Sequence, residues 1–301
     1  MITVIGSINL DLIGRAVRLP KPGETVPGDR FDTAPGGKGA NQALAARRAG
    51  AEVAMIGAVG KDAFAAEATA LLASAGVDLS RVREAATATG VALILVGGDG
   101  ENMIAVVPGA NGTVLPGDVA AAKLEKDDVV LLQHEIPLET VEAALDAARE
   151  AGALSVLNTA PFRAEAASFL GKADYVVANE TEFDLYANAL SLKGGDREAR
   201  MRDFVQRTGR AVIVTLGADG ILAVDAKGAF FRIPAMKIVP VDTVGAGDTF
   251  CGYLAHGLEA GLSLEEALRR AGVAGSLACL KHGAQPSIPL AGEVRAALRA
   301  R

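Results

Sequence analysis

The residues best suited to chemistry lie in one nonapeptide, residues 242–250, which reads Asp-Thr-Val-Gly-Ala-Gly-Asp-Thr-Phe. Gly245, Ala246 and Gly247 can bring successive backbone N–H groups close to an anion, because glycine admits positive φ and carries no Cβ. Asp248 then opens an expected helix, whose free amides and positive dipole end would face the loop. A helix start of this kind suits a phosphate.

Asp248 has two interpretations. An aspartate before an apolar run is most often a helix N-cap. The glycine loop in front of it, and a second aspartate at Asp242, favour a catalytic role instead. In that role the amides stabilise charge on a γ-phosphate, while the Asp248 carboxylate takes the proton of an attacking hydroxyl. The nonapeptide therefore predicts the centre of a kinase, with Asp248 as the base and residues 245–247 as an anion hole.

A second glycine cluster, residues 35–42, reads Pro-Gly-Gly-Lys-Gly-Ala-Asn-Gln. It is not a P-loop, because Lys38 is followed by Gly39 rather than by Ser or Thr. The glycines would let the backbone approach a polyhydroxy substrate while Lys38 and Asn41 donate hydrogen bonds. A tight loop with an exposed lysine fits the same residues.

Polar residues also follow the apolar runs expected to be strands. Asn9 and Asp11 are two apart, so both lie on one side if the first strand continues. Such residues point to the carboxyl edge of the sheet, where open α/β sheets bind ligands, and they suit vicinal sugar hydroxyls. An Asx-turn is the alternative. Glu135 follows the run at 129–133 and is either a substrate contact or a solvated loop acid.

Two further segments could serve a nucleotide. Asn179 and Glu182, three apart at an expected helix start, would share a face and could form an outer-shell site for hydrated Mg²⁺ and phosphates. A helix cap is the alternative. Residues 215–220 end another strand, and their glycines could accommodate ribose and phosphates or form a plain hairpin turn into residues 221–224.

Hydrophobic periodicity places these residues on a fold. Apolar runs at 2–5, 53–59, 128–132, 153–157, 175–178 and 211–215 alternate with amphipathic stretches at 39–49, 62–75, 138–151 and 196–208. This alternation predicts an α/β fold with a central, mostly parallel sheet flanked by helices on both faces. Two insertions, at about 12–35 and 89–108, predict a small β-sheet lid on a single unit of residues 1–301. A lid would exclude water from the γ-phosphate.

Composition excludes several classes of function. The 301 residues carry a net charge of −6, with three Tyr, nine Phe and no Trp, which argues against a nucleic-acid binder. Cys251 and Cys279 lie in apolar stretches and are expected to be reduced core residues, and the three histidines lack metal-ligand spacing. Without a signal peptide or an apolar run of about 18–20 residues, a cytoplasmic protein with no membrane partner is expected.

Taken together, the motifs resemble the ribokinase-like (PfkB-type) carbohydrate kinase family over nearly the whole chain. In this order they are highly specific, whereas each glycine cluster alone would be weak. The matching segments are Gly-Ser-Ile-Asn-Leu-Asp at 6–11, Pro-Gly-Glu-Thr at 22–25, Gly-Gly-Lys-Gly-Ala-Asn-Gln-Ala at 36–43, Thr-Gly-Val-Ala-Leu-Ile at 89–94, Gly-Glu-Asn at 100–102, Gly-Ala-Asn at 109–111, Asn-Glu-Thr-Glu at 179–182, the nonapeptide at 242–250, and Gly-Ala-Gln-Pro-Ser at 283–287.

The resemblance implies ATP-dependent phosphorylation of D-ribose at its 5-hydroxyl to give D-ribose 5-phosphate. The alternatives are another small sugar or nucleoside, such as deoxyribose, fructose, ketodeoxygluconate or adenosine, or a non-catalytic sugar-sensing protein. Implied sugar-binding residues are Asn9, Asp11, Gly37, Lys38, Gly39, Asn41, Glu135 and Asp248. Implied ATP-binding residues are Asn179, Thr215, Leu216, Gly217, Ala218, Asp219, Gly220 and Gly247.

The same resemblance implies cations and a partner. Mg²⁺ would accompany ATP, and K⁺ or a similar monovalent cation would act as an activator beside the anion hole. A homodimer through the β lids is also implied. At one position the chain departs from the family, because Gly272 stands where relatives often carry Asn or His beside the adenine. Implied ligands of the monovalent cation are Asp242, Val244, Ala278, Lys281, Gly283 and Ser287.

Overall fold

A nine-stranded sheet forms the centre of the protein, as the computed structural model of residues 1–300 shows. Its order is β13-β12-β11-β10-β9-β8-β1-β4-β5, and all neighbours are parallel except β11-β12 and β12-β13. The predicted mostly parallel sheet is therefore confirmed. The strands are β1 (Ile2–Ile5), β4 (Val53–Gly60), β5 (Asp78–Ala85), β8 (Val129–Leu132), β9 (Leu154–Asn158), β10 (Tyr175–Asn179), β11 (Ala211–Thr215), β12 (Ile221–Val224) and β13 (Phe230–Ile233).

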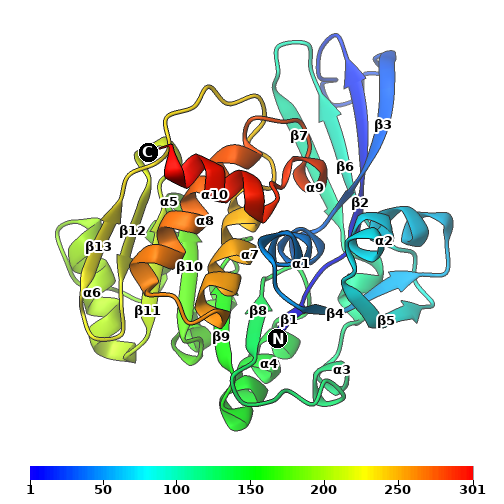
Figure 1. Ribbon diagram of the computed structural model, residues 1–301. Helices are drawn as coiled ribbons and strands as arrows, with labels where there is room; N and C mark the ends of the chain where they lie inside the picture. Colours follow the sequence, from blue (N-terminus) through cyan, green and yellow to red (C-terminus); the bar gives the residue numbers. More distant parts are fainter. Residues whose placement is uncertain (301) are drawn as a thin grey trace.

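Helices cover both faces of this sheet (Figure 1). Successive residues of β8 belong to different cores, with Val129 and Leu131 in one and Val130 and Leu132 in the other, because strand side chains alternate between faces. One core holds α1 (Lys38–Ala49), α2 (Ala63–Ala75), α7 (Ala246–Glu259), α8 (Leu264–Ala278) and α10 (Ala291–Arg299). The other holds α3 (Pro116–Ala120), α4 (Leu138–Ala151), η2 (Ala164–Lys172), α5 (Glu180–Ala189) and α6 (Arg197–Thr208).

A separate four-stranded sheet projects from the main body (Figure 1). Its order is β3-β2-β6-β7, formed by β2 (Asn9–Ala16), β3 (Gly28–Gly36), β6 (Gly90–Val96) and β7 (Asn102–Val107). The predicted small separate sheet is therefore present, and its two halves are joined by the parallel pairing of β2 with β6. The smaller sheet begins earlier than predicted, however, because β1 stops at Ile5 and a new strand starts at Asn9. Asn9 and Asp11 consequently lie on β2 rather than on a continuation of β1.

The strand order creates a natural binding edge. From β1 the chain adds β4 and β5 on one side, then returns to place β8 and its successors on the other side. Ligands of open α/β sheets bind at the carboxyl ends of strands where the order reverses in this way. The ends of β1 and β8 therefore mark the expected site. Two edge strands, β5 and β13, were not predicted, since β5 is largely exposed and polar and β13 is only partly buried.

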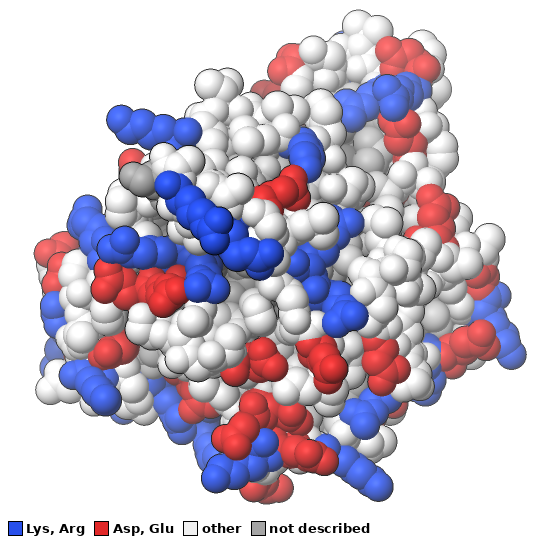
Figure 2. All heavy atoms as spheres, viewed as in Figure 1, with Lys and Arg blue, Asp and Glu red and all other residues white. Residues whose placement is uncertain are grey.

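The surface shows the mixed character expected from composition. Lys and Arg lie among Asp and Glu over the face in Figure 2. Cys251 and Cys279 are free and buried, as predicted. Within residues 1–300, no helix has the length and apolar character needed to cross a membrane.

Candidate active site

Helix α7 starts one turn earlier than the sequence suggested. It begins at Ala246, and Gly245 is its cap in the left-handed conformation, with φ 76°. Asp248 is therefore the third helical residue, and its interpretation as an N-cap is wrong. No side chain caps α7, whereas α2, α5, α6 and α8 have the side-chain caps Asp62, Asn179, Asp196 and Ser263. The first-turn amides of α7 thus lack a protein cap, as an anion site requires.

Two amide side chains of α1 hold the Asp248 carboxylate. Asn41 Nδ2 donates to Oδ2 at 2.9 Å, and Gln42 Nε2 donates to Oδ1 at 2.9 Å. All three side chains are buried. The two helices approach closely at Gly252, where an added Cβ would lie 2.5 Å from the Ala45 Cβ. A carboxylate held in this way keeps a defined orientation inside the protein.

Charged groups from separate elements influence one another around Lys38. Asp248 chiefly raises the pKa of Lys38, with smaller contributions from Glu135 and Glu182 and with burial acting against them. Burial, and then the nearby carboxylates of Glu135 and Asp248, raise the pKa of Asp11 to about 6. Burial likewise raises the pKa of Glu182. Lys38 therefore interacts with carboxylates of α5, α7 and the loop after β8, and Asp11 of β2 interacts with the last two of these.

We expect an Asp11→Asn variant to change how stability depends on pH. The pKa of Asp11 is about 6 in the folded protein against an ordinary value of 3.8, so its contribution to stability is full below pH 3.8 and is lost as pH rises through 6. Asparagine has no such proton. The unfolding free energy of wild type minus that of the variant should fall by roughly 1–3 kcal/mol from about pH 4 to pH 7.5. Urea denaturation of both proteins across this range measures it; a constant difference would contradict the assignment.

Side chains of the protein accept hydrogen bonds from the amides at the start of α1. Glu135 Oε2 accepts from Ser7 Oγ at 2.6 Å and from the Lys38 amide at 3.0 Å. Ser7 Oγ in turn accepts from the Gly39 amide at 3.2 Å. Glu135 is therefore not a solvated loop acid, and its carboxylate fixes the glycine cluster against the ends of β1 and β8.

Asn9 is positioned by a segment that follows the smaller sheet. The short helix η1 (Gly109–Thr113) carries Asn111, whose Oδ1 accepts from the Ile8 amide at 2.8 Å. Its Nδ2 donates to the Ile8 carbonyl at 3.1 Å and to Asn9 Oδ1 at 2.7 Å. Because Asn9 and Asn111 are both buried, this contact sets the orientation of the Asn9 amide.

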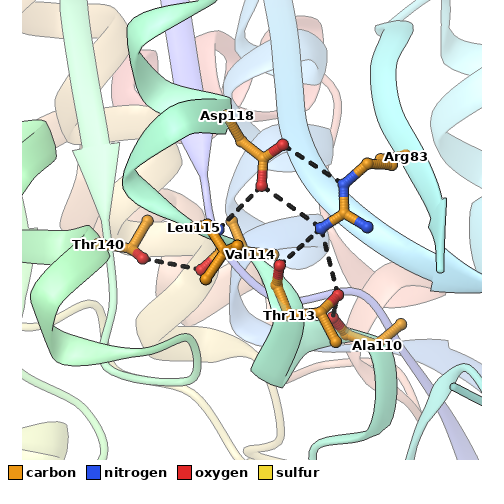
Figure 3. Close-up of polar contacts among 7 residues, drawn as sticks. All are labelled: Arg83, Ala110, Thr113, Val114, Leu115, Asp118 and Thr140. Carbon is orange, nitrogen blue, oxygen red and sulfur yellow. Dashed lines mark hydrogen bonds and ion pairs between the residues drawn. The ribbon is translucent and has the colours of Figure 1, made fainter. Parts of the chain in front are cut away.

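Polar contacts anchor the end of η1 to the main body (Figure 3). Arg83 from β5 donates to the Thr113 carbonyl at 2.6 Å and forms an ion pair with Asp118 at 3.3 Å. Thr140 from α4 donates to the Val114 carbonyl at 2.7 Å. The segment that orients Asn9 is consequently fixed at the point where the chain leaves the smaller sheet.

A cavity of about 220 Å³ opens at the start of α7. It brings together seven of the predicted site residues, and Cys251, buried beside them, has a pKa raised well above its usual range by that burial. The cavity is lined by Lys38, Asn158, Ala160, Val177, Ala178, Asn179, Glu182, Thr215, Thr243, Gly245, Gly247, Asp248, Phe250 and Cys251.

The two segments predicted for a nucleotide have clear local structures. Asn179 and Glu182 form a capping box on α5, in which Asn179 Oδ1 accepts from the Glu182 amide at 2.8 Å and Glu182 Oε2 accepts from the Asn179 amide at 3.0 Å. The helix-cap interpretation is thus confirmed, and both residues still line the cavity. Residues 215–220 form the hairpin between β11 and β12, with η3 (Gly217–Asp219) in the turn. Only Thr215 of this segment lines the cavity.

The loops predicted to hold a monovalent cation lie together. Asp242 Oδ1 accepts from the Val244 amide at 3.0 Å and its Oδ2 from the Gly283 amide at 2.9 Å. The Cys279 carbonyl accepts from the amides of Val241 and Asp242. Gly283 precedes the short helix α9 (Ala284–Ser287). Among the described residues no cluster of three or more His, Cys, Asp or Glu could hold a metal ion.

Sequence reasoning missed several polar residues of the site. Gln42, Gln133 and Asn158 are buried and linked to Asp248 by hydrogen bonds, and Ser7 and Asn111 fix Glu135 and Asn9. The sequence could have revealed two of these residues, because Gln133 and Asn158 stand at the ends of apolar strand runs, as Glu135 and Asn179 do.

Comparisons with known proteins identify the family of this chain. The profile of the pfkB family carbohydrate kinases matches residues 1–291. The chain is 39% identical to a ribokinase of Lactococcus lactis, over 99% of this chain and 97% of that protein, and 35% identical to a deoxyribokinase of Salmonella typhi, over 96% and 95%. The structure of Arabidopsis thaliana ribokinase complexed with ribose and ATP superposes with a TM-score of 0.86 at 29% identity, covering 99% and 98% of the two chains. The protein described above belongs to the pfkB family of carbohydrate kinases.

Proposed function

We propose that this carbohydrate kinase transfers the γ-phosphoryl group of ATP to the 5-hydroxyl of D-ribose. The observation that carries the proposal is the buried Asp248 carboxylate, fixed by two amide side chains at the uncapped start of α7 and lining a cavity. The ribokinases among the relatives support ribose as the sugar. The deoxyribokinase relative makes deoxyribose the second candidate.

The proposed reaction needs one proton acceptor and one anion cradle. As the sugar oxygen forms its bond to the γ-phosphorus, the hydroxyl proton passes to the Asp248 carboxylate. The bond from the γ-phosphorus to the bridging oxygen breaks, and ADP leaves. The loop of Gly245, Ala246 and Gly247 and the dipole of α7 stabilise the charge on the transferring group. The chain thus supplies positioning and electrostatics rather than a covalent intermediate.

The sugar is proposed to lie between the smaller sheet and the start of α1. Asn9 and Asp11 reach this region from β2, and Lys38, Asn41 and Glu135 belong to the ends of α1 and β8. Carboxylates and amides can together match both the donors and the acceptors of adjacent hydroxyls. Gly37 and Gly39 let the start of α1 pack against residues 6–9, because an added Cβ would lie 2.7 Å from the Asn9 amide nitrogen or 2.6 Å from that of Ser7.

ATP is proposed to extend from the anion hole toward α5 and the β11–β12 hairpin. Glu182 keeps Oε1 free after its Oε2 caps α5, so it fits an outer-shell contact to hydrated Mg²⁺. Mg²⁺ would supply charge neutralisation at the phosphates. Asn179 keeps its Nδ2 group for a phosphate or bridging water, since its Oδ1 is occupied. Thr215 lines the same cavity, which supports the nucleotide's place beside it.

A monovalent cation such as K⁺ is proposed beside the anion hole. The residues present fit one, because Asp242 holds the two loops together while the backbone carbonyls nearby provide hard oxygen donors. The proposed ligands remain Asp242, Val244, Ala278, Lys281, Gly283 and Ser287.

Replacing K⁺ by tetramethylammonium at constant ionic strength is expected to lower kcat severalfold. A large organic cation cannot fit among carbonyl oxygens, so the loop that carries Gly245 would lose its support. Initial rates at saturating ATP and sugar measure the effect, and titrating K⁺ back should restore the rate along a saturable curve. Equal rates in the two salts would remove the cation site.

The smaller sheet is proposed to act as a lid and as a dimer interface. Its strand β7 is an edge with six exposed residues, among them Met103, Ile104 and Val106. Phe31 is 67% exposed on β3, the strand at the other edge of the same sheet. Exposed apolar edge strands tend to pair with another chain. A second copy of the same sheet would cover both the β7 edge and Phe31.

We expect Ile104→Lys with Val106→Lys to convert a dimer into a monomer. Two charges on the edge strand would have to be desolvated in the interface, which opposes pairing. Sedimentation velocity over a range of concentrations measures the change. Leu185→Lys is the matched control, because Leu185 is an exposed apolar residue on α5, outside the smaller sheet. A wild-type protein that stays monomeric would disprove the interface.

The decisive test is ADP release with ATP, Mg²⁺ and K⁺ across ribose, deoxyribose, fructose, ketodeoxygluconate and adenosine, compared by kcat/KM. Dominance of ribose would confirm the substrate. Dominance of another compound would keep the kinase mechanism and replace the substrate.

The unpaired cysteines fit a reducing compartment, so we place this reaction in the cytoplasm.

A further inference from the structure

The Asp248 carboxylate is held by two adjacent side chains that differ in how firmly each is fixed. Asn41 and Gln42 each donate one hydrogen bond to it, at the same distance of 2.9 Å. Beyond that bond their surroundings are unlike. Asn41 Oδ1 is buried and has no hydrogen-bond partner within the described part of the chain, so no hydrogen bond there holds the far side of that amide.

Gln42, by contrast, is fixed at both ends of its amide. Its Oε1 accepts from Gln133 Nε2 at 2.6 Å, and its Nε2 also donates to Asn158 Oδ1 at 3.2 Å. Gln42 and Gln133 are fully buried. Turning the Gln42 amide over would place its oxygen against the Asp248 carboxylate and against Asn158 Oδ1, where neither contact has a proton to share. Only one orientation is therefore allowed, since an unpaired buried polar group costs about 1–3 kcal/mol.

The amides connect three strands to the catalytic helix. Gln133 follows β8, and Asn158 ends β9 and donates from Nδ2 to the Val177 carbonyl of β10 at 3.3 Å. Among residues 1–300, Gln42 is the one that joins these amides to Asp248 by hydrogen bonds. Hydrogen bonds through the Gln42 side chain thus connect the carboxyl ends of these strands to Asp248.

We propose that Gln42 is a positioning residue that sets the plane of the Asp248 carboxylate for proton transfer. It holds Oδ1, which leaves Oδ2, the oxygen beside the adjustable Asn41, to receive the proton of the sugar hydroxyl. Gln42 itself touches no substrate. The inference rests on the proposed function, because it assigns Gln42 a part in the step that Asp248 performs.

The primary test is Gln42→Met, which keeps the volume of the side chain and removes its hydrogen bonds. We expect kcat to fall roughly tenfold to hundredfold, the effect of a small misplacement of a reacting group, with the KM for sugar and for ATP changed less than about twofold. Gln133→Met, which removes the support of Gln42 without touching Asp248, should give a smaller fall in the same direction. If Gln42→Met does not fold, the kcat of Gln133→Met decides whether Gln42 has a positioning role.

A double-mutant cycle separates positioning from general damage. When Asp248 is already asparagine, Gln42→Met should change the residual rate by less than about twofold, because there is no base left to orient. If Gln42 has only a structural role, Gln42→Met should lower the rate equally in the wild-type and the Asp248→Asn backgrounds. That result would overturn the proposal. Ser155→Ala is the matched control, since Ser155 is a buried residue of β9 whose hydroxyl donates to Asp174 at 2.9 Å, away from Asp248. It should lower the melting temperature while kcat stays unchanged.

Two different outcomes separate the role of Gln42 from the proposed kinase activity. If wild type phosphorylates a sugar and Asp248→Asn does not, but Gln42→Met keeps full kcat, then the kinase stands and Gln42 has no positioning role. If wild type turns over no sugar in the panel, the proposed function fails first, and the role of Gln42 fails with it.

Discussion

Replacing Asp248 by asparagine is expected to lower kcat by about 10²–10⁴-fold, the contribution typical of a general base. Asparagine cannot accept the hydroxyl proton, yet it has nearly the same shape as aspartate. The site can adapt to it, because the Asn41 amide can turn and offer its unpartnered Oδ1 to the new amide nitrogen. The variant should therefore fold and keep its substrates.

Three measurements establish that result. Initial rates of ADP release give kcat, calorimetric titration gives the affinities for ATP and for the sugar, and thermal unfolding reports stability. The expected pattern is a lost rate with affinities within about threefold of wild type. A variant that turns over at a near-normal rate would show that another group accepts the proton.

The second large effect is expected for Gly245→Ala, which should lower kcat by about 10²–10³-fold, as the loss of an anion-hole donor does. Gly245 has φ 76°, a conformation that alanine adopts only with strain. The new Cβ would also lie 2.9 Å from the Cα and the Cβ of Ala284. Relief of that contact would shift the loop away from α9 and misdirect the amides at the start of α7.

Gly261→Ala provides the matched control for this prediction. Gly261 lies just beyond the other end of α7, has φ 71°, and has open space where a Cβ would stand. It carries the same backbone strain, about 1–2 kcal/mol, without the contact to another segment. We expect Gly261→Ala to lower the melting temperature and to leave kcat unchanged. Equal losses of kcat in the two variants would mean that backbone strain alone, rather than the position of the anion loop, explains the effect.

Local patterns predicted most of the framework correctly. Apolar runs predicted six strands of the central sheet, since strands buried on both faces need continuous hydrophobic sequence. Polar residues after those runs, such as Glu135 and Asn179, were correctly placed at the carboxyl edge. The exposed edge strand β5 was missed because its solvated side chains leave no apolar pattern.

The sequence by itself determined the family and singled out residues 245–247 and Asp248 for the roles proposed above, because these motifs consist of residues that are neighbours along the chain. Only the tertiary structure decided where Asp248 lies within the first turn of α7, since the conformation of Gly245 sets the start of that helix. It also decided that Gln42 holds the Asp248 carboxylate. The two residues are 206 positions apart, and a local pattern of helical spacing carries no information about which distant carboxylate a buried amide will meet.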